Sequence, residues 1–315
     1  MTALGLKAGL LLRLRIVSQP VRHVIYKLAE ILGGWAFLSR PGQALWRMSL
    51  AARAISPPPG IRAAMIAHIY YPELLDEVLA SWRALPDGAP LHLTVTAERA
   101  DELRARLGAR AGVVVHETPN RGRDIAPFLA VLASGALDGY QAVLKLHTKR
   151  SPHLWTGELR RRLLFVLHSG EAAQVRRILN GFANPHVGLA GWRWMLRTRA
   201  SYWNANEGTV RGLMGRMAPD APVDLAFFEG SMFWFRPAAL EPLRRLGLTS
   251  ADFEEEAGQT DGALQHAVER CFGLAARAAG YWTTDLSGRR VLTPPPVESA
   301  TADRFEASPY PSAGS

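Results

Sequence analysis

The stretch from residue 113 to residue 151 places the tightest constraint on the fold of this chain. An apolar strand pattern at residues 113–115 leads into the charged turn Asn-Arg-Gly-Arg-Asp at 120–124. A helical pattern covers residues 125–137, and a second strand pattern at 141–146 ends in His-Thr-Lys-Arg-Ser. The two strands of a strand–helix–strand unit are normally parallel, so both polar turns are expected at the same carboxyl-terminal edge of a sheet. Open α/β sheets bind ligands at this edge, and the cations favour an anionic, phosphate-bearing ligand.

The preceding residues extend the same alternation. Strand patterns at residues 63–69 and 91–96 are followed by helical patterns at 72–85 and 97–107. Strands that alternate with helices of about ten residues predict a Rossmann-type α/β domain, with a mostly parallel sheet flanked by helices. Downstream, strand patterns cover residues 187–190, 227–236 and 281–284, and helical patterns cover 157–179, as one or two helices, 237–246 and 261–279.

The N-terminal segment, residues 1–56, is predicted to be helical and differs in charge from the rest. Residues 1–60 hold eight cations and one anion, whereas the remaining 255 residues hold 29 cations and 27 anions. No uncharged run reaches the roughly 18–20 residues that span a bilayer. Two interpretations stay open: a basic amphipathic helix on an anionic membrane surface, or a helix packed on the domain with a solvated basic face. Nucleic-acid binding is disfavoured, because the body of the chain has no basic excess.

The remaining boundaries follow from composition. The proline-rich residues 57–60 indicate a linker, and residues 61–293 form the predicted α/β domain. Residues 294–315 are rich in Pro, Ser, Ala and Gly, and we expect a disordered tail. The single cysteine, Cys271, excludes an internal disulfide and fits a reducing compartment.

The first polar turn supplies candidate residues for binding the phosphate-bearing ligand: Asn120, Arg121, Gly122 and Asp124. A glycine lets the backbone approach a ligand closely, and the following helix offers its first N–H groups to an anion. An arginine binds phosphate through two parallel hydrogen bonds. Asp124 accepts either from ribose hydroxyls or from the helix N-terminus as a cap, and both readings stay open.

The second polar turn adds His147, Lys149 and Arg150, and the end of the first strand adds His68 and Tyr70. A lysine is a compact cation suited to neutralising a leaving diphosphate, and a histidine can donate to the same oxygens. No Asp-x-Asp motif, the usual divalent-metal site of nucleotide-sugar transferases, occurs in the sequence. We therefore expect no metal.

A later motif, Asp-Gly-Ala-Leu-Gln-His from residue 261, contains candidates for base chemistry. Asp261 is either a general base for an acceptor hydroxyl or a carboxylate placed at a helix start, and His266 lies close to it in sequence. The glutamates at 254–256 compete for the role of base.

Residues 228–236, Phe-Glu-Gly-Ser-Met-Phe-Trp-Phe-Arg, supply the acceptor-side candidates Gly230, Ser231 and Trp234. Aromatic rings stack on sugar faces, and a glycine allows close backbone approach. The alternative is that these aromatic residues fill the core beside the sheet.

Four motifs, NRGRDIAPF, LKLHTKRSPH, EGSMFWFRP and DGALQHAVER, occur in this order and spacing. Together they resemble the rhamnan synthesis protein F family over about residues 62–290. The resemblance implies a GT-A-like fold and a glycosyltransferase of bacterial surface-polysaccharide assembly. It also implies a nucleotide-sugar donor such as dTDP-rhamnose, and a glycan or polyprenyl-linked acceptor at the inner face of the cytoplasmic membrane.

Carried onto this sequence, the resemblance assigns the residues from 120 to 124 to the diphosphate, and His147 with Lys149 to the place of metal-binding aspartates. It assigns Gly230 and Ser231 to the acceptor side and Asp261 with His266 to base chemistry. A second hypothesis remains: a non-catalytic glycan- or nucleotide-binding subunit of a membrane-associated assembly complex.

Overall fold

The structure is a computed structural model that describes residues 28, 31–52, 60–150 and 157–293. The tail predicted at 294–315, most of the linker at 57–60 and most of the segment before residue 31 lie outside the described residues. The chain divides into two units, Met1–Ala54 with Arg150–Leu164, and Ile55–Lys149 with Phe165–Ser315.

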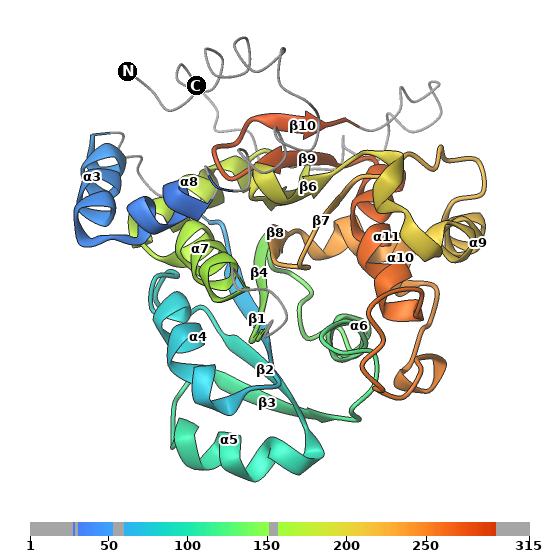
Figure 1. Cartoon of the computed structure of the whole chain (residues 1–315), viewed down its shortest axis with the longest axis horizontal. Coiled ribbons are helices and arrows are strands. Elements are labelled where there is room, and N and C mark those ends of the chain that lie inside the picture. The colour runs from blue at the N-terminus through green and yellow to red at the C-terminus, as the bar shows by residue number, and fades with distance from the viewer. Residues whose placement is uncertain (1–27, 29–30, 53–59, 151–156, 294–315) are drawn as a thin grey trace, which may run out of the picture. The chain divides into compact units, whose positions relative to one another are not determined.

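The larger unit is built on an eight-stranded sheet (Figure 1) with the order β10-β9-β5-β8-β4-β1-β2-β3. The strands are β1 Ala63–Ile69, β2 Leu91–Thr96, β3 Val113–Thr118, β4 Ala142–His147, β5 Val187–Gly191, β8 Phe233–Phe235, β9 Trp282–Asp285 and β10 Arg290–Leu292. The pairs β1–β2, β2–β3, β1–β4 and β5–β9 are parallel, whereas β8 is antiparallel to β4 and β5, and β10 to β9. The predicted mostly parallel sheet is therefore confirmed, with two opposed strands.

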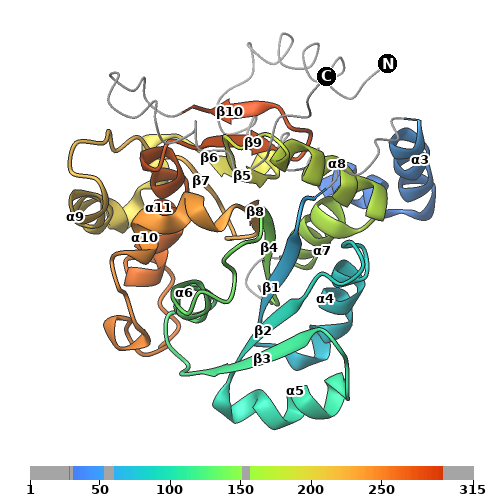
Figure 2. The same ribbon diagram turned by 180° about the vertical axis from the view of Figure 1, so that it is seen from behind.

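Helices cover both faces of the sheet. Two helices lie on one side of β1–β3, α4 Leu75–Trp82 and α5 Ala100–Leu107, and α6 Ile125–Ala133 lies on the other (Figures 1 and 2). The α6 side also carries α10 Glu241–Arg244 and α11 Leu264–Ala278, and α9 Glu207–Met217 packs against α11. Two further helices are α8 Ala172–Phe182 and α7 Gly157–Ser169, of which residues 157–164 belong to the smaller unit.

The core on the α6 side is an aromatic cluster in which rings of α6, β8 and α11 meet. Phe128 contacts Phe235 and Phe272 edge-on, with centroids 5.3 and 5.6 Å apart. The ring centroids of Phe233 and Phe272 lie 5.1 Å apart. Since alternate residues of a strand face opposite sides, Trp234 between the two phenylalanines faces the other side of the sheet, where its indole N–H donates to the His168 carbonyl at 3.2 Å.

Two predicted elements differ from those in the structure. The expected strand at 227–236 becomes β7 Phe227–Phe228, paired with β6 Leu196–Arg197 in a separate sheet, and β8. The chain turns between them because Gly230 and Ser231 both have positive φ, 91° and 53°. The helix expected at 261–279 begins three residues later, at Leu264.

The smaller unit contains a helix over residues 31–38 and α3 Arg40–Ala51. Ser39 separates them and caps α3, its hydroxyl accepting from the Gly42 N–H at 3.2 Å. Pro41 occupies the first turn, where a missing N–H costs nothing. Among the described residues, no helix combines the length and apolar character required to cross a bilayer.

Candidate functional site

The sheet face that carries α6 changes from apolar to polar toward the carboxyl ends of β1 and β4. On β1 this face presents Ile66 and then His68, and on β4 it presents Val143, Lys145 and His147. The strands are neighbours and parallel, with His68 opposite His147. The carboxyl edge of the sheet therefore brings together side chains that are about 80 positions apart, as the pattern of polar turns predicted.

Lys145 is the centre of the polar cluster, although its side chain is only 2% exposed. Its ammonium donates to Asp124 Oδ2 at 2.5 Å, to Ser231 Oγ at 2.8 Å and to the Ser231 carbonyl at 2.9 Å. These three acceptors use all three ammonium protons, which is the condition for burying a lysine at tolerable cost. The same ammonium lies 5.2–5.9 Å from the ring centroids of Phe128, Phe233 and Phe272.

Asp124 is the anionic partner of this lysine. Burial alone would raise its pKa, but the charge of His147 when that ring is protonated at acid pH, the charge of Lys145 and the hydrogen bond from Lys145 outweigh burial and hold the pKa well below its usual range. The carboxylate is therefore ionised throughout the neutral range. Its fixed negative charge balances the buried ammonium.

Asp124 directly precedes α6, yet its side chain makes no capping hydrogen bond. The first two helical N–H groups, of Ile125 and Ala126, donate instead to the Gly122 carbonyl at 2.9 and 3.2 Å. Pro127 has no N–H to offer. The capping interpretation of Asp124 is wrong, and the expectation that these N–H groups face an anion is wrong as well.

The two histidines beside Asp124 are neutral in the folded protein. Burial lowers the pKa of His68 to about 4 and that of His147 to about 3, although the Asp124 charge acts in the opposite direction. His68 Nδ1 lies 3.0 Å from the Thr94 hydroxyl. His147 Nδ1 lies 3.4 Å from Asp124 Oδ2 without hydrogen-bond geometry, and finds no partner among the described residues. His147 therefore keeps one buried ring nitrogen without a hydrogen bond among the described residues.

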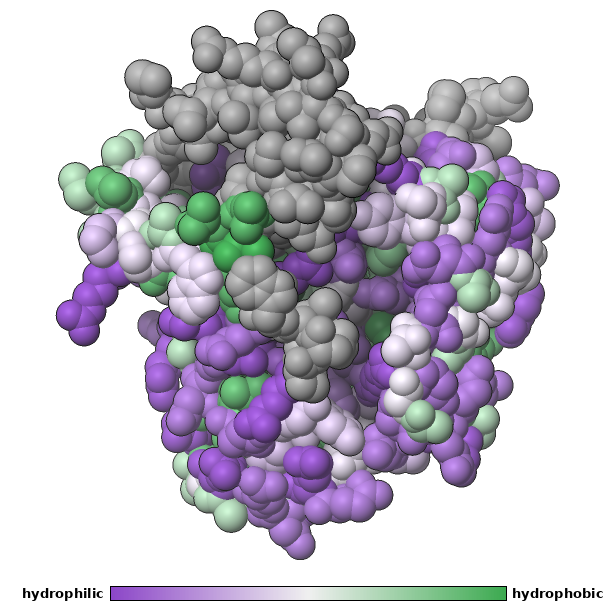
Figure 3. Space-filling view, viewed as in Figure 1, coloured by the Kyte–Doolittle hydropathy of each residue, from purple (hydrophilic) through white to green (hydrophobic). Residues whose placement is uncertain are grey.

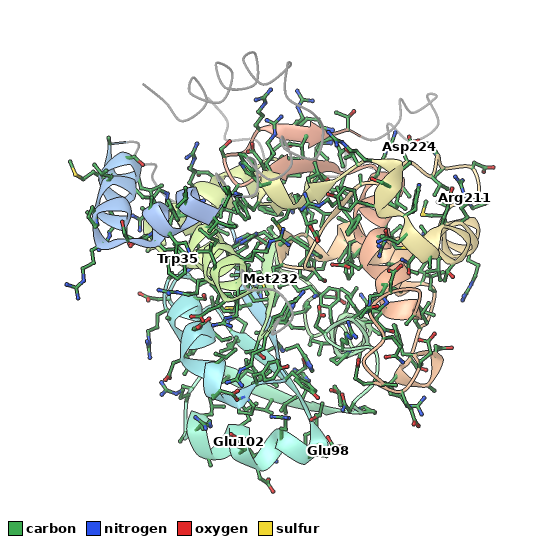
Figure 4. All side chains as sticks on the ribbon, in the orientation of Figure 1. Trp35, Glu98, Glu102, Arg211, Asp224 and Met232 are labelled. Carbon is green, nitrogen blue, oxygen red and sulfur yellow. The ribbon has the colours of Figure 1, made fainter. Side chains whose placement is uncertain are left out.

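The turn at Gly230 and Ser231 closes the cluster from the β8 side. The Gly230 N–H donates to Glu269 Oε1 at 2.8 Å, and Met232, the residue after the turn, is labelled in Figure 4. Burial and the neighbouring Asp124 charge raise the pKa of Glu269, while Lys149 lowers it. Glu269 of α11 is thus a half-buried carboxylate whose proton affinity is increased.

Trp234, predicted on the acceptor side, is fully buried and faces the opposite side of the sheet from Lys145. Its indole has no accessible face on which a sugar could stack. The prediction for Trp234 is therefore wrong, and the alternative that it fills the core holds.

The arginines of the first turn are bound to the acidic loop at 254–256. Arg121 donates to Glu255 Oε1 at 2.6 Å and to the Phe253 carbonyl at 3.1 Å. Arg123 donates to both oxygens of Glu256, at 2.9 and 3.2 Å, and to the Gln259 carbonyl. These ion pairs hold the acidic loop against the turn. Both guanidinium groups are therefore paired with carboxylates in this structure.

Gly122 is buried with φ +63°, and a Cβ there would lie 2.6 Å from Phe253 and 2.7 Å from Ala126. The glycine is required for the close approach of the turn to the acidic loop. Asn120, the first residue of the turn, is exposed.

Asp261 and His266 lie beside the acidic loop. Asp261 Oδ2 accepts from the Ala205 N–H at 3.0 Å, and Oδ1 from the Asn206 amide at 2.7 Å. Burial acts to raise the pKa of Asp261, but these hydrogen bonds and Arg270 lower it. His266 Nδ1 accepts from the Ala263 N–H at 3.3 Å, and burial with the nearby Arg123 lowers the pKa of His266.

The remaining predicted donor-side residues lie just after β1 and β4. The backbone N–H groups of Tyr70 and Tyr71 both donate to the Thr148 hydroxyl, at 2.9 and 3.0 Å, which ties the two strand ends together. Lys149 is exposed and acts electrostatically on both His147 and Glu269. Arg150 is exposed and belongs to the smaller unit.

Sequence reasoning did not single out Lys145, Glu269 or Arg123 individually as site residues. A signal existed for Lys145, because it is the one charged residue in an otherwise apolar strand and lies two positions before His147, on the same face. Glu269 gave no such signal, since a glutamate on a helix is ordinarily a solvated residue.

Two further observations concern where a metal or another ligand could bind. Among the described residues, no three His, Cys, Asp or Glu side chains are grouped as metal ligands would be. A cavity of about 530 Å³ is lined by Thr198, Ala200, Trp203, residues 223–226, Arg277 and residues 291–293. It shares no lining residue with the cluster around Lys145.

The fold and the cluster define a mixed α/β protein with charged side chains gathered at the carboxyl edge of its parallel strands, the usual ligand edge of such sheets. The chain belongs to the rhamnan synthesis protein F family, whose sequence profile matches residues 49–281. The printed description of the family refers to rhamnan synthesis.

Two curated relatives are each called "Uncharacterized protein WxcX" and come from two strains of Xanthomonas campestris pv. campestris. They are 36% and 35% identical to this chain over 275 residues, which is 84% of the chain. The chain spans 38% of the length of each relative.

Proposed function

We propose that this chain is a glycosyltransferase with a GT-A-like domain. In this proposal it transfers a sugar, with dTDP-rhamnose as the first donor to test, to a glycan or polyprenyl-linked acceptor at the cytoplasmic face of the membrane. The observation that carries the proposal is the Asp124–Lys145 pair beside His147. It joins the two polar turns at the ligand edge of the sheet, in a chain whose family is named for rhamnan synthesis.

The donor diphosphate lies over the ends of β1 and β4 in this proposal. Lys149, exposed after β4, neutralises the diphosphate charge, and the neutral His147 and His68 donate N–H groups to its oxygens. Asp124 is a positioning residue: as a carboxylate it repels phosphate, but it fixes Lys145 and the ring of His147 beside the ligand. Since cations and N–H donors occupy the place of a metal site, we expect transfer to persist in EDTA.

Two carboxylates compete for the role of general base. Asp261, favoured by the sequence, has both oxygens hydrogen-bonded and a lowered pKa, which weakens it as a proton acceptor. Glu269 has a raised pKa, one oxygen bound to the Gly230 N–H, and a place beside Asp124 and Lys149. A base is most effective when its pKa approaches the working pH, so we assign the role to Glu269.

In the proposed step, Glu269 takes the proton of an acceptor hydroxyl while that oxygen attacks the anomeric carbon of the donor. The bond from the anomeric carbon to the diphosphate oxygen breaks, and the nucleoside diphosphate leaves with the electron pair. Gly230 and Ser231 then border the acceptor. Direct displacement of this kind inverts the anomeric configuration.

The test uses purified full-length chain and a panel of nucleotide sugars, with thermal shift to report donor binding and release of nucleoside diphosphate to report turnover. We expect one donor to stabilise the protein and to be transferred or hydrolysed. Glu269→Gln should lower turnover by about 100-fold or more and leave the donor thermal shift unchanged. Glu102→Gln on α5, labelled in Figure 4, is the matched control and should change neither.

Two outcomes would contradict these assignments. If Asp261→Asn abolishes turnover and Glu269→Gln leaves it near normal, the base is Asp261. If no nucleotide sugar shifts the melting temperature or is consumed, the chain is not a transferase.

The pairing of both turn arginines with Glu255 and Glu256 supports a second candidate, a non-catalytic nucleotide- or glycan-binding subunit. Donor binding without any consumption, in the presence of a membrane fraction as a source of acceptors, would favour this candidate.

A further inference from the structure

The two helices of the smaller unit expose several large apolar side chains to solvent. Leu32, Trp35, Leu45 and Met48 are 68%, 55%, 67% and 68% exposed, and Leu28 is 49% exposed. Among the described residues only two other large hydrophobic side chains are exposed to a comparable degree, Val114 and Trp194. Figure 3 shows hydrophobic side chains over α3 at the upper left.

The helix over residues 31–38 contains no charged residue in its sequence, Ile-Leu-Gly-Gly-Trp-Ala-Phe-Leu. Its buried side is made by Ile31 and Gly34, and a Cβ at Gly34 would lie only 3.0 Å from Leu163 of α7. Its solvent-exposed side carries Leu32 and Trp35, and Trp35 is labelled in Figure 4. A surface helix of a globular protein carries polar residues on that side.

The helix α3 repeats this arrangement. Leu50 is buried, whereas Leu45 and Met48, three positions apart and so on one face, are exposed. Arg40 and Arg47, seven positions apart, lie along one edge of the exposed apolar face. The result is an apolar stripe bordered by cations.

The two helices are held in a fixed relation by several contacts. The Gln43 amide donates to the Phe37 carbonyl at 2.8 Å, and the rings of Phe37 and Trp46 meet edge-on at 5.4 Å. With the Ser39 cap, these contacts fix the junction between the helix over residues 31–38 and α3. The exposed apolar residues of both helices are therefore presented together rather than on a flexible segment.

The sequence around this apolar surface is basic, and its positive charge favours an anionic partner. From residue 31 to residue 72 the sequence contains no aspartate or glutamate and four arginines, Arg40, Arg47, Arg53 and Arg62. Before residue 31 the only acidic residue is Glu30, against five cations. An apolar face that contains a tryptophan, on a segment whose charged residues from 31 to 72 are all arginines, is complementary to the interface of an anionic bilayer.

We infer that Leu32, Trp35, Leu45 and Met48 form a membrane-contact face that inserts into the interface of an anionic bilayer. The four side chains insert at the boundary between headgroups and acyl chains, and the arginines bind the lipid phosphates. This inference concerns the smaller unit alone and holds whether or not the chain transfers sugars.

The test is co-sedimentation of the full chain with vesicles of phosphatidylcholine containing 30 mol% phosphatidylglycerol, a composition chosen for the experiment. We expect binding that weakens in pure phosphatidylcholine vesicles and in high salt. The variants Leu32→Gln/Trp35→Gln and Leu45→Gln/Met48→Gln should each lower the partition coefficient by about tenfold or more, since each removes the burial of two large apolar side chains.

The matched control is Trp194→Gln, which removes a tryptophan of similar exposure, 48%, from the larger unit. It should leave vesicle binding unchanged. Circular dichroism checks that each variant is folded, and the two variant pairs test the surface independently.

Three results would overturn the inference: no binding of the wild-type chain to anionic vesicles, equal loss of binding in Trp194→Gln, or unchanged binding in both variant pairs. Light scattering in the absence of lipid supplies a further check. A dimer that the Leu45→Gln/Met48→Gln pair dissociates would show that a second copy of the chain covers this face.

Discussion

Replacement of Lys145 by methionine tests the central cluster most directly. Methionine keeps much of the apolar stem but removes the ammonium, which leaves the Asp124 carboxylate, 14% exposed, without its cation. Breaking a buried ion pair by removing one partner costs about 3–5 kcal/mol. Asp124 can escape by taking up a proton, and for a carboxyl of ordinary pKa this costs about 4 kcal/mol at pH 7. We therefore expect Lys145→Met to lose about 3–4 kcal/mol of stability at pH 7.

The same reasoning fixes how this loss depends on pH. The cost of protonating Asp124 falls by about 1.4 kcal/mol for each pH unit, so at pH 5 the penalty of Lys145→Met should shrink to about 1.5 kcal/mol. The double variant Asp124→Asn/Lys145→Met removes both charges and should be more stable than the sum of the two single losses implies.

The assay is urea denaturation followed by tryptophan fluorescence and circular dichroism at pH 5 and pH 7. Lys149→Met is the matched control, because the same replacement four positions later falls on an exposed lysine and should change stability by no more than about 0.5 kcal/mol. A loss of less than 1 kcal/mol in Lys145→Met, or a penalty of equal size at both pH values, would refute the argument that the Asp124 charge is buried and paired.

Two further perturbations follow from the geometry. The pKa values of His68 and His147 are lowered in the folded state to about 4 and about 3. In the unfolded chain the same side chains have a pKa of about 6.5. As the pH falls below about 6.5, the unfolded chain therefore binds more protons than the folded protein does. Stability should therefore fall by about 4 kcal/mol in total between pH 7 and pH 5, and the double variant His68→Gln/His147→Gln should flatten this dependence in the same urea assay. Gly122→Ala forces an L-residue to a positive φ and a Cβ to within 2.6 Å of Phe253, so we expect a loss of about 2–4 kcal/mol in urea denaturation. Gly208→Ala, in a helix with open space around it, should instead be neutral or stabilising, and equal effects of the two substitutions would contradict the packing argument.

The alternation of strands and helices in the first half of the chain was predictable because it depends on the local spacing of apolar residues. The strands predicted at 63–69 and 91–96 have those bounds in the structure, and the helix expected from residue 125 begins there. Periodicity also placed His147 at the carboxyl edge of the sheet. Element ends were less accurate: α6 stops at Ala133 rather than at 137, shortly before Gly135 with φ +78°.

The chemistry of the cluster was only partly predictable. Asp124, His147, His68 and Ser231 were named from their motifs, and the structure brings them together around Lys145. Trp234 was misplaced because the turn at Gly230 and Ser231 sets which residues of β8 face α6. The sequence does not reveal that turn, since Ser231 is a non-glycine residue with positive φ.

The sequence by itself determined the local elements, the family and the polar character of the two turns. The tertiary structure alone decided which polar groups become partners. Lys145 meets Ser231, 86 positions away, because β8 pairs antiparallel with β4 and lies between β4 and β5 in the sheet. Periodicity depends on neighbouring residues and is read from a short window, whereas strand order depends on packing between distant segments. The buried ion pair at the centre of the candidate site therefore emerges only when the sheet is assembled.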